Sequence, residues 1–378
     1  KSEVGVVSKQ MVERINVEVR AAAGHQQWRN TQEVIEWFKK LPNQSEMTFI
    51  KFDIVEFYPS ISEELLSKSI TYAKSLTNIT KREERIIWHA RQSLLFGGDS
   101  TWVKKDGNLF DVTMGSFDGA EVCELVGLYL LHLLSQRFDK KLIGLYRDDG
   151  LSALKLSGPQ ADRARKDIVR IFKECGLRVT IEILLTQTDF LDITLDLTSG
   201  KYWPYRKPNN DPLYINAKSN HPPSIIKQLP TAINSRLASI SCNEEEFAKA
   251  KPVYEDALKK SGYKHKMEFE RTKIKPSRSR KRKVIWFNPP FNQNVKTNVA
   301  KRFLYLVDKH FPKHHRYHKL FNRSNVKVSY SCMSNMATVI SSHNSKVLNP
   351  PPASVPRTCN CRQPDDCPLN GKCLTECV

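Results

Sequence analysis

The chain has 378 residues, of which 60 are Lys or Arg and 40 are Asp or Glu, so its formal net charge is +20. Because 40% of the residues are hydrophobic, the chain can bury a core, which excludes wholesale disorder and predicts about two or three domains. The charged fraction of 26% is near average, so the positive net charge arises because basic residues stand in place of acidic ones. This bias indicates a polyanionic partner, nucleic acid before anionic membrane.

No apolar run is long enough to cross a bilayer, since the best stretch, residues 122–134, is interrupted by Glu124 and His132. No secretory signal is visible near Lys1, which stands where a whole chain would begin with Met, so we expect a fragment. The 9 cysteines are an odd number and do not resemble a disulfide framework. We therefore expect a soluble intracellular protein that makes no use of a membrane.

The first 45 residues are predicted to be largely helical. Residues 48–54 form a β-prone run that ends at an acid, which predicts a strand that carries Asp53 to the edge of a sheet. A turn at residues 58–62 precedes a helical stretch to residue 95, and a hairpin is predicted at residues 102–112.

The next segment predicts a helix over residues 120–138, with Asp118 as its cap. Residues 142–154 then predict strand, acidic turn and strand, with Asp148 and Asp149 at the tip. The alternation of helices and strands that follows indicates an α+β domain, with a helix at 160–175, a strand at 178–185 and a hairpin-like pair at 190–197 and 201–205.

The character of the chain changes beyond Pro208. Prolines punctuate short helical pieces before an amphipathic helix at residues 244–261, which predicts a second, helical unit. A basic run follows and leads into an aromatic segment at 284–291; we interpret the run as a phosphate-contacting strip, a nuclear localisation signal or a solvated linker. Its main cations are Arg278, Arg280, Lys281, Arg282 and Lys283.

Asp53, Asp148 and Asp149 would converge on one edge if their strands share a sheet. Three such carboxylates repel one another unless cations are present, and two Mg²⁺ ions there would activate a hydroxyl for attack on phosphate. The pattern therefore predicts phosphoryl or nucleotidyl transfer. The alternative is that Asp148, Asp149 and Gly150 merely make a type I′ hairpin turn.

The series of motifs resembles the reverse transcriptases, and among them the proteins of Penelope-like retroelements. Residues 53–61 resemble the first palm motif, and residues 146–149, Tyr-Arg-Asp-Asp, resemble the Tyr-x-Asp-Asp signature. Between them, residues 114–120 are similar to the glycine-bearing motif that contacts template and nucleotide, although the usual Ser-Pro is missing. The resemblance covers most of the chain.

The resemblance implies a right-hand polymerase with a ferredoxin-like palm, acting as the RNA-directed DNA polymerase of a retrotransposon. It would copy an RNA template from a DNA primer and dNTPs, in the nucleus. The implied domains are fingers and palm at 1–211, a helical thumb at 212–270, a basic RNA- and DNA-binding extension at 271–349, and a Pro- and Cys-rich linker at 350–378.

The resemblance also assigns roles to single residues. Two Mg²⁺ ions would be held by Asp53 and Asp148, with Asp149 as a third and looser carboxylate, and Tyr58 would be a steric gate against ribonucleotides. Residues 201–208 resemble the segment that grips the primer. The remaining candidates contact nucleotide, template or primer: Gly115, Ser116, Gly119, Arg147, Arg206 and Lys207.

Arg147 departs from the family pattern, which has a small or medium apolar residue at this position of the signature. A guanidinium there could contact phosphate, or it could mark a catalytically inactive or domesticated nucleic-acid-binding protein. A two-metal nuclease is a third hypothesis, disfavoured by the spacing of Tyr58 and by the separate thumb.

Two groups near the end of the chain could hold metal. His310, His314, His315 and His318 are interleaved with cations, which favours an RNA-contacting helix over a metal site. Five thiols in the polar tail predict a Zn²⁺ site that needs four of them: Cys359, Cys361, Cys367, Cys373 and Cys377. In Penelope-like proteins such a linker precedes a GIY-YIG endonuclease; no such element is seen before Val378, so we expect no nicking activity.

Overall fold

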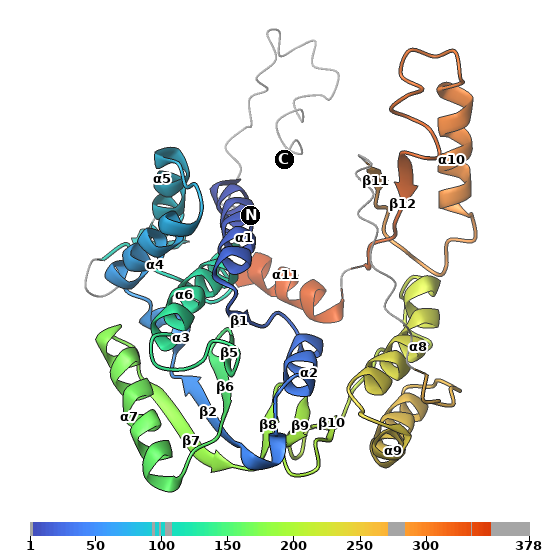
Figure 1. The fold of residues 1–378 in the computed structure, drawn as a ribbon. Coiled ribbons are helices and arrows are strands. Elements are labelled where there is room, and N and C mark those ends of the chain that lie inside the picture. The colour runs from blue at the N-terminus through green and yellow to red at the C-terminus, as the bar shows by residue number, and fades with distance from the viewer. Residues whose placement is uncertain are drawn as a thin grey trace. The chain divides into compact units, whose positions relative to one another are not determined.

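The computed structural model describes residues 3–92, 95–97, 100–102, 108–270, 284–333 and 335–348. The chain divides into a first unit, Lys1–Tyr214 with Pro230–Ile274, and a second unit, Ile215–Leu229 with Lys275–Val378 (Figure 1). The basic run and the five terminal cysteines lie outside the described residues, so both remain predictions. None of the described helices is long and apolar enough to cross a membrane.

A five-stranded sheet forms the centre of the first unit. Its strand order is β1-β5-β6-β2-β7, and only β1 is parallel to its neighbour. The bounds are Gln26–Gln27 for β1, Ile143–Tyr146 for β5, Asp149–Leu154 for β6, Thr48–Ile54 for β2 and Val179–Leu185 for β7. With α6 (Gly119–Leu134) and α7 (Gly158–Glu174), the strands β2, β5, β6 and β7 form a βαββαβ succession in a mixed α+β fold.

The first core lies between one face of this sheet and a layer of helices (Figure 1). Ile50, Phe52 and Ile54 of β2 point into it, since alternate residues of a strand share a face. The buried helix α6, which is apolar on most sides, packs beside α7 in this layer. The other main helices of the layer are α1 (Glu3–Ala23) and α4 (Glu63–Leu76).

The second core covers the opposite face of the sheet, where Phe49 of β2 points. It is formed by α2 (Thr31–Lys39) and by a three-stranded sheet of order β10-β9-β8. The prediction of one strand over residues 190–197 was wrong, because a two-residue turn separates β8 from β9. The bounds are Gln187–Phe190 for β8, Ile193–Asp196 for β9 and Tyr202–Pro204 for β10.

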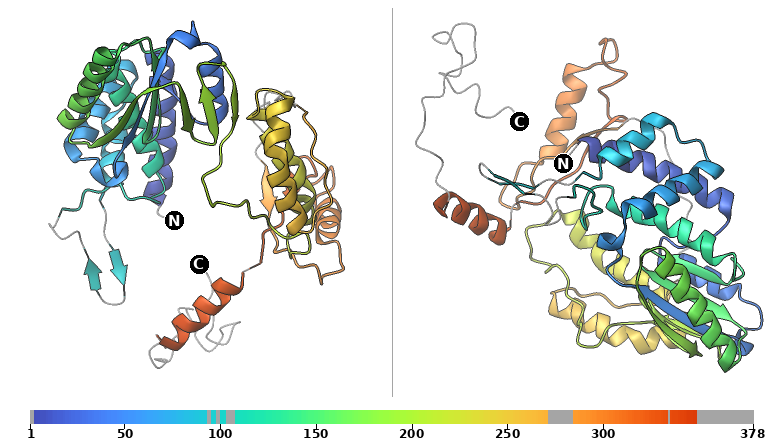
Figure 2. Two further views of the ribbon diagram at one scale, coloured as in Figure 1. Left: turned by 90° about the horizontal axis from the view of Figure 1, so that it is seen from below. Right: turned by 90° about the vertical axis from the view of Figure 1, so that its left-hand side faces the viewer.

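The helical stretch predicted over residues 62–95 is also divided. It contains α4 and α5 (Lys81–His89), because Thr80 starts a new helix through a capping box with Glu83. A hairpin then forms earlier than predicted, from β3 (Leu95–Gly97) and β4 (Ser100–Trp102), and Figure 2 shows it projecting from the first unit. Residues 103–107 of the predicted hairpin lie outside the described residues.

The helix α8 (Pro223–Ser239) begins in the second unit and belongs to the first unit from Pro230 onward. In the first unit it packs with α9 (Glu244–Lys260) on a small third core around Leu237, Phe247 and Leu258. In the second unit, β11 (Ile285–Phe287) pairs in parallel with β12 (Val326–Val328). Besides the first residues of α8, its described helices are α10 (Val299–His310) and α11 (Met336–Leu348). The prediction of a histidine-bearing helix was therefore wrong in its extent: α10 ends at His310, and the other three histidines follow it.

Candidate active site

The backbone brings the three predicted carboxylates to one end of the central strands. Asp53 of β2 pairs directly with Asp149 of β6, and the amide of Ile54 donates to the carbonyl of Asp148 at 3.0 Å. The hairpin β5–β6 closes on the pair Tyr146 and Asp149. The turn therefore consists of Arg147 and Asp148, and Asp149 belongs to a strand, not to the tip of the turn as predicted.

Gly150 has a packing role in this hairpin. It lies inside β6 opposite Phe52, and a Cβ at this position would come within 2.0 Å of the Phe52 ring. Of the three residues predicted for a type I′ turn, Asp148 therefore lies in the turn, whereas Asp149 and Gly150 lie in β6. Glycine is required because an aromatic ring covers the strand beside the carboxylates.

Burial and, after it, the nearness of like charges raise the pKa values of two carboxyl groups at this edge. Burial, followed by the charge of Asp148, raises the pKa of Asp53. Burial, then Asp148 and Asp53, raise the pKa of Asp149 to about 6. Lys51 and Lys207 act in the opposite direction on Asp149 but do not cancel the effect. The edge thus favours uptake of a proton or of a cation.

A metal ion here would need partners beyond the protein. Within the described ranges, no group of three or more His, Cys, Asp or Glu side chains is arranged to hold a metal ion. Mg²⁺ typically binds one or two carboxylates and completes its shell with water and substrate phosphate. The oxygen donors and excess negative charge of this edge fit that mode of binding.

Tyr58 lies close to the carboxylate edge and to the start of α6. It belongs to the single helical turn α3 (Phe57–Ser60), which follows β2. A Cβ on Gly119 would be 3.7 Å from the Tyr58 ring, so the ring stands against the start of α6. Burial and the neighbouring Cys123 raise the pKa of Tyr58, with smaller effects from Arg147 and Asp148. Half-buried Tyr58 is therefore near the signature turn.

The loop before α6 contains the predicted nucleotide-contact residues. Gly115 is exposed with φ of 90°, a conformation that favours glycine. The Ser116 hydroxyl is buried and has no hydrogen-bond partner within the part of the chain that the structure describes. At Gly119, a Cβ would be 2.5 Å from that hydroxyl oxygen, so the loop closes tightly on the helix.

Asp118 does not cap α6 through its side chain, contrary to prediction. Its carboxylate forms a buried ion pair with Arg91 and accepts a hydrogen bond from Ser8 of α1. The side chains of Arg91 and Asp118 are 1% and 2% exposed. This pair connects the region after α5 to the start of α6, and no local sequence pattern predicted it.

The predicted cations differ in their surroundings. Arg147 is exposed, has φ of 55°, and its guanidinium carbon lies 5.7 Å from the centre of the Tyr146 ring. Arg206 pairs with Asp211 at 2.5 Å. Lys207 is exposed, and its charge acts to lower the pKa of Asp149. Arg147 and Lys207 therefore accompany the carboxylates.

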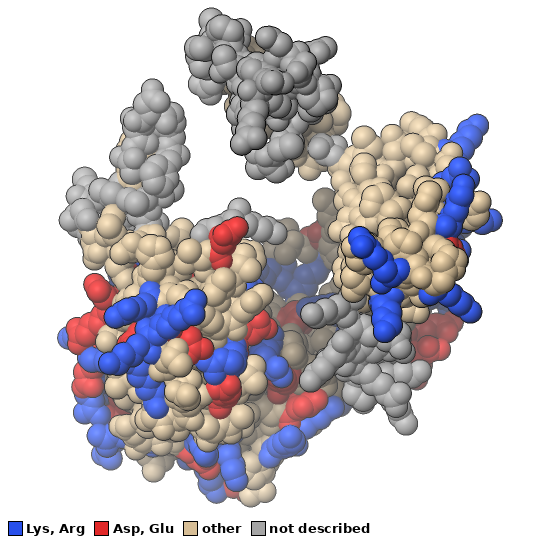
Figure 3. Space-filling model, turned by 90° about the horizontal axis from the view of Figure 1, so that it is seen from above, with Lys and Arg blue, Asp and Glu red and all other residues tan. Residues whose placement is uncertain are grey.

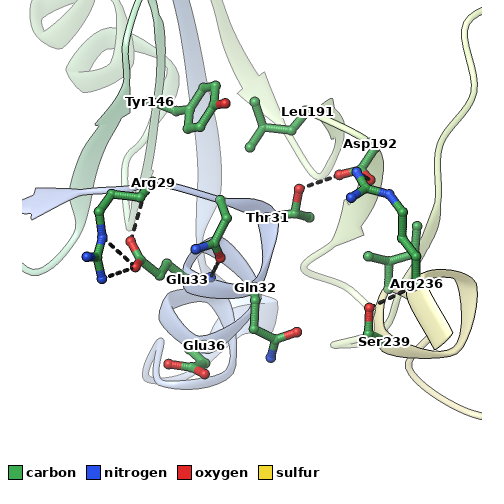
Figure 4. Close-up of a pocket in the computed structure, with 12 residues that line it drawn as sticks. Arg29, Thr31, Gln32, Glu33, Glu36, Tyr146, Leu191, Asp192, Arg236 and Ser239 are labelled. Atoms are coloured by element: carbon green, nitrogen blue, oxygen red, sulfur yellow. Dashed lines mark hydrogen bonds and ion pairs between the residues drawn. The ribbon is translucent and has the colours of Figure 1, made fainter. Parts of the chain in front are cut away.

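A cavity of about 720 Å³ lies beside the signature hairpin, and Tyr146 lines it (Figure 4). Its other walls come from the start of α2, the β8–β9 turn and α8. In this turn Asp192 accepts a hydrogen bond from Thr31 of α2 and pairs with Arg236 of α8. Asp192 thus connects three elements, which the sequence analysis missed because it placed this residue within a strand.

No family model and no curated protein matches the sequence. Among solved structures, telomerase from Candida albicans with a fragment of telomeric RNA is similar at 14% identity and a TM-score of 0.49, covering 68% of this chain and 46% of that one. Apo telomerase from Candida tropicalis is similar at 13% identity and a TM-score of 0.43, and the match covers 68% of this chain and 50% of that one. The RNA-dependent RNA polymerase of a human picobirnavirus is similar at 9% identity and a TM-score of 0.41, and the match covers 68% of this chain and 54% of that one. The chain thus spans about half of each.

Proposed function

We propose that this chain contains the ferredoxin-like palm of a template-directed polymerase, the RNA-directed DNA polymerase of a Penelope-like retrotransposon. The observation that carries the proposal is the pairing of Asp53 with Asp149 beside Asp148, at one end of a βαββαβ sheet. Tyr58 lies near Asp148 and against the start of α6, and Thr113 and Ser116 of the Gly115 loop close on the same helix start. The substrates would be dNTPs, on an RNA template with a DNA primer.

In this proposal Asp53 and Asp148 would hold Mg²⁺. When bound, two ions would supply electrostatic stabilisation to the attacking and leaving oxygens of a displacement at phosphate. The raised pKa of Asp149 suits a third carboxylate that is engaged less tightly.

The chain's own residues would position the reactants. The Tyr58 ring would lie under the sugar of the incoming nucleotide and exclude a 2′-hydroxyl. The exposed backbone at Gly115 would allow close approach of template or nucleotide, since no side chain stands there. Lys207 and Arg206 would contact the primer backbone, as cations commonly do in nucleic-acid complexes.

Primer extension on an RNA template with Mg²⁺ and dNTPs tests the proposal. The wild-type chain should extend the primer, and Asp148→Asn should lower the rate on the order of 10²-fold or more while leaving hybrid binding intact. Asp167→Asn, which alters a surface carboxylate of α7 paired with Arg170, is the matched control and should extend normally.

The exposed Arg147 favours one alternative, a non-catalytic protein that still binds nucleic acid. A wild-type chain that binds the hybrid without extending the primer would support it. Arg147→Met in the same assay would then show whether the guanidinium prevents catalysis.

A further inference from the structure

The second unit is strongly basic. Residues 284–333 contain nine Lys or Arg residues and one acidic residue, Asp308, by count of the sequence. That aspartate pairs with Arg323 at 2.6 Å, so its charge is already matched. Figure 3 shows Lys and Arg side chains spread over this unit on the face seen from above. Such a field attracts polyanions.

Aromatic side chains in this unit fall into two classes. Phe287 stacks on Phe303 with ring centres 4.1 Å apart, and Phe311 stacks on Phe321 at 4.7 Å. The four rings of these pairs are half-buried and pack on one another. Other aromatic rings remain in solvent, with exposed fractions of 58% for Trp286, 50% for Tyr305 and 41% for Tyr317. Large exposed rings beside cations are typical of surfaces that bind a ligand.

Two of the exposed rings are paired with arginine. The guanidinium carbon of Arg302 lies 5.5 Å from the centre of the Tyr305 ring on α10, and that of Arg316 lies 4.3 Å from the Tyr317 ring. His315 supports the second pair, because its Nδ1 accepts from the Tyr317 amide. Each pair therefore places a flat cation beside a ring that still has accessible surface.

We propose that the second unit binds an unpaired nucleic-acid strand, with bases stacked on Tyr305 and Tyr317 and phosphates contacted by Arg302 and Arg316. Bases of a duplex already stack on one another, so a duplex would leave these rings without partners. In an unpaired strand the bases can stack on the rings while the phosphates contact the cations. Proteins bind single strands without sequence preference in this way. These residues belong to the second unit and the carboxylates to the first, and binding of a strand here does not depend on catalysis.

Fluorescence anisotropy on the full chain tests the proposal, with a single-stranded RNA, a DNA of the same sequence and the corresponding duplex as probes. Tyr305→Ala with Tyr317→Ala should weaken binding of both single strands about 10-fold or more and change duplex binding less than about 2-fold. Tyr305→Phe with Tyr317→Phe keeps the rings and should bind as the wild type does. Leu306→Ala with Leu320→Ala, at exposed apolar positions of the same unit, is the matched control.

A second readout separates this site from binding by the first unit. An RNA that carries 4-thiouridine should cross-link to the segment that contains Tyr305 or Tyr317, and the double alanine variant should lose those cross-links. Arg302→Gln with Arg316→Gln should reduce the salt slope of single-strand binding by about 1 to 2. Equal loss for single strand and duplex, or cross-links confined to the first unit, would overturn the proposal. Unchanged strand binding with loss of self-association would assign the rings to a protein contact instead.

Discussion

Asp149 shows how backbone pairing creates an unusual ionisation state. Its pKa is about 6 in the folded chain, above its ordinary value, because it is partly buried beside Asp148 and Asp53. A group whose pKa is raised by folding stabilises the fold at low pH, and this contribution is lost as the pH rises through the folded value. The ionised carboxylate therefore destabilises the metal-free protein above about pH 6.

Asp149→Asn should consequently raise the melting temperature of the metal-free protein at pH 7.5, by about 2–4 °C for each kcal/mol gained. The difference from wild type should shrink as the pH falls below 6, where the wild-type carboxyl holds its proton. Calorimetry in EDTA across this range measures it, and added Mg²⁺ should narrow the gap at pH 7.5. Identical melting curves at every pH would contradict the assigned environment of Asp149.

The role of Tyr58 depends on the volume of its ring. Tyr58→Ala should raise incorporation of ribonucleotides relative to deoxyribonucleotides by about 10- to 100-fold, since the space beneath the sugar opens. Single-nucleotide insertion with matched NTP and dNTP pairs measures the ratio. Tyr58→Phe keeps the ring and should keep the selectivity. If the alanine variant discriminates as well as the wild type, Tyr58 serves only in packing.

Among the elements, α6 is placed by an ion pair as well as by its apolar surface. Arg91→Met would leave the buried Asp118 charge without its partner, and this should lower the free energy of unfolding by about 3–5 kcal/mol. Urea titration measures the loss. Arg165→Gln, which breaks an exposed pair with Asp162 on α7, should cost about 1 kcal/mol or less.

A double substitution tests whether the fold needs the two charges themselves or is only destabilised when one charge is left without its partner. Arg91→Met with Asp118→Leu removes both charges and should recover most of the loss, because well-packed apolar residues commonly replace a buried pair. A double variant as unstable as Arg91→Met would show that the charges themselves hold α6 in place.

The β8–β9 turn is connected to α8 by the ion pair of Asp192 with Arg236. Asp192→Asn keeps the size of the side chain but removes its charge, so α8 should be held less firmly against the hairpin. We expect the primer–template to dissociate about two- to five-fold faster, in keeping with a partly exposed ion pair. The rate of nucleotide insertion on bound hybrid should change little.

Pre-steady-state insertion and a competitor-trap assay separate these two rates. Lys201→Gln is the matched control, because Lys201 and Glu245 form another exposed pair between the β10 region and α9, at 3.7 Å. An insertion rate that falls while dissociation is unchanged would assign Asp192 to the reaction itself.

For the whole molecule, the net charge of +20 predicts binding that weakens steeply with salt. Each phosphate contact contributes a slope of about −0.7 to −0.9 to the dependence of log K on log salt. Neutralising the five cations of the basic run together should flatten this slope on an RNA/DNA hybrid: Arg278, Arg280, Lys281, Arg282 and Lys283. An unchanged slope with failed nuclear import would identify the run as a localisation signal.

Local sequence patterns were sufficient for much of the fold. The strand at residues 48–54 forms as predicted, and so does the strand, turn and strand of residues 142–154, although only Asp148 of the two adjacent carboxylates lies in the turn. The helices α7 and α9 begin and end within about two residues of their predicted limits. Strand alternation, helical periodicity and capping depend on near neighbours in the chain, so the sequence alone determines them.

Tertiary structure decided which of these pieces meet. Asp53 faces Asp149 only because β2 lies beside β6. The Asp118 side chain does not cap α6 because it binds Arg91, 27 residues away, and Ser8, 110 residues away. The turn at Asp192 likewise takes its role from Thr31, 161 residues away. These contacts depend on strand order and on competition among distant partners for a buried charge. Neither the strand order nor this competition can be read from the spacing of neighbouring residues. The sequence alone therefore indicated which carboxylates to consider, and the tertiary structure decided that they lie together.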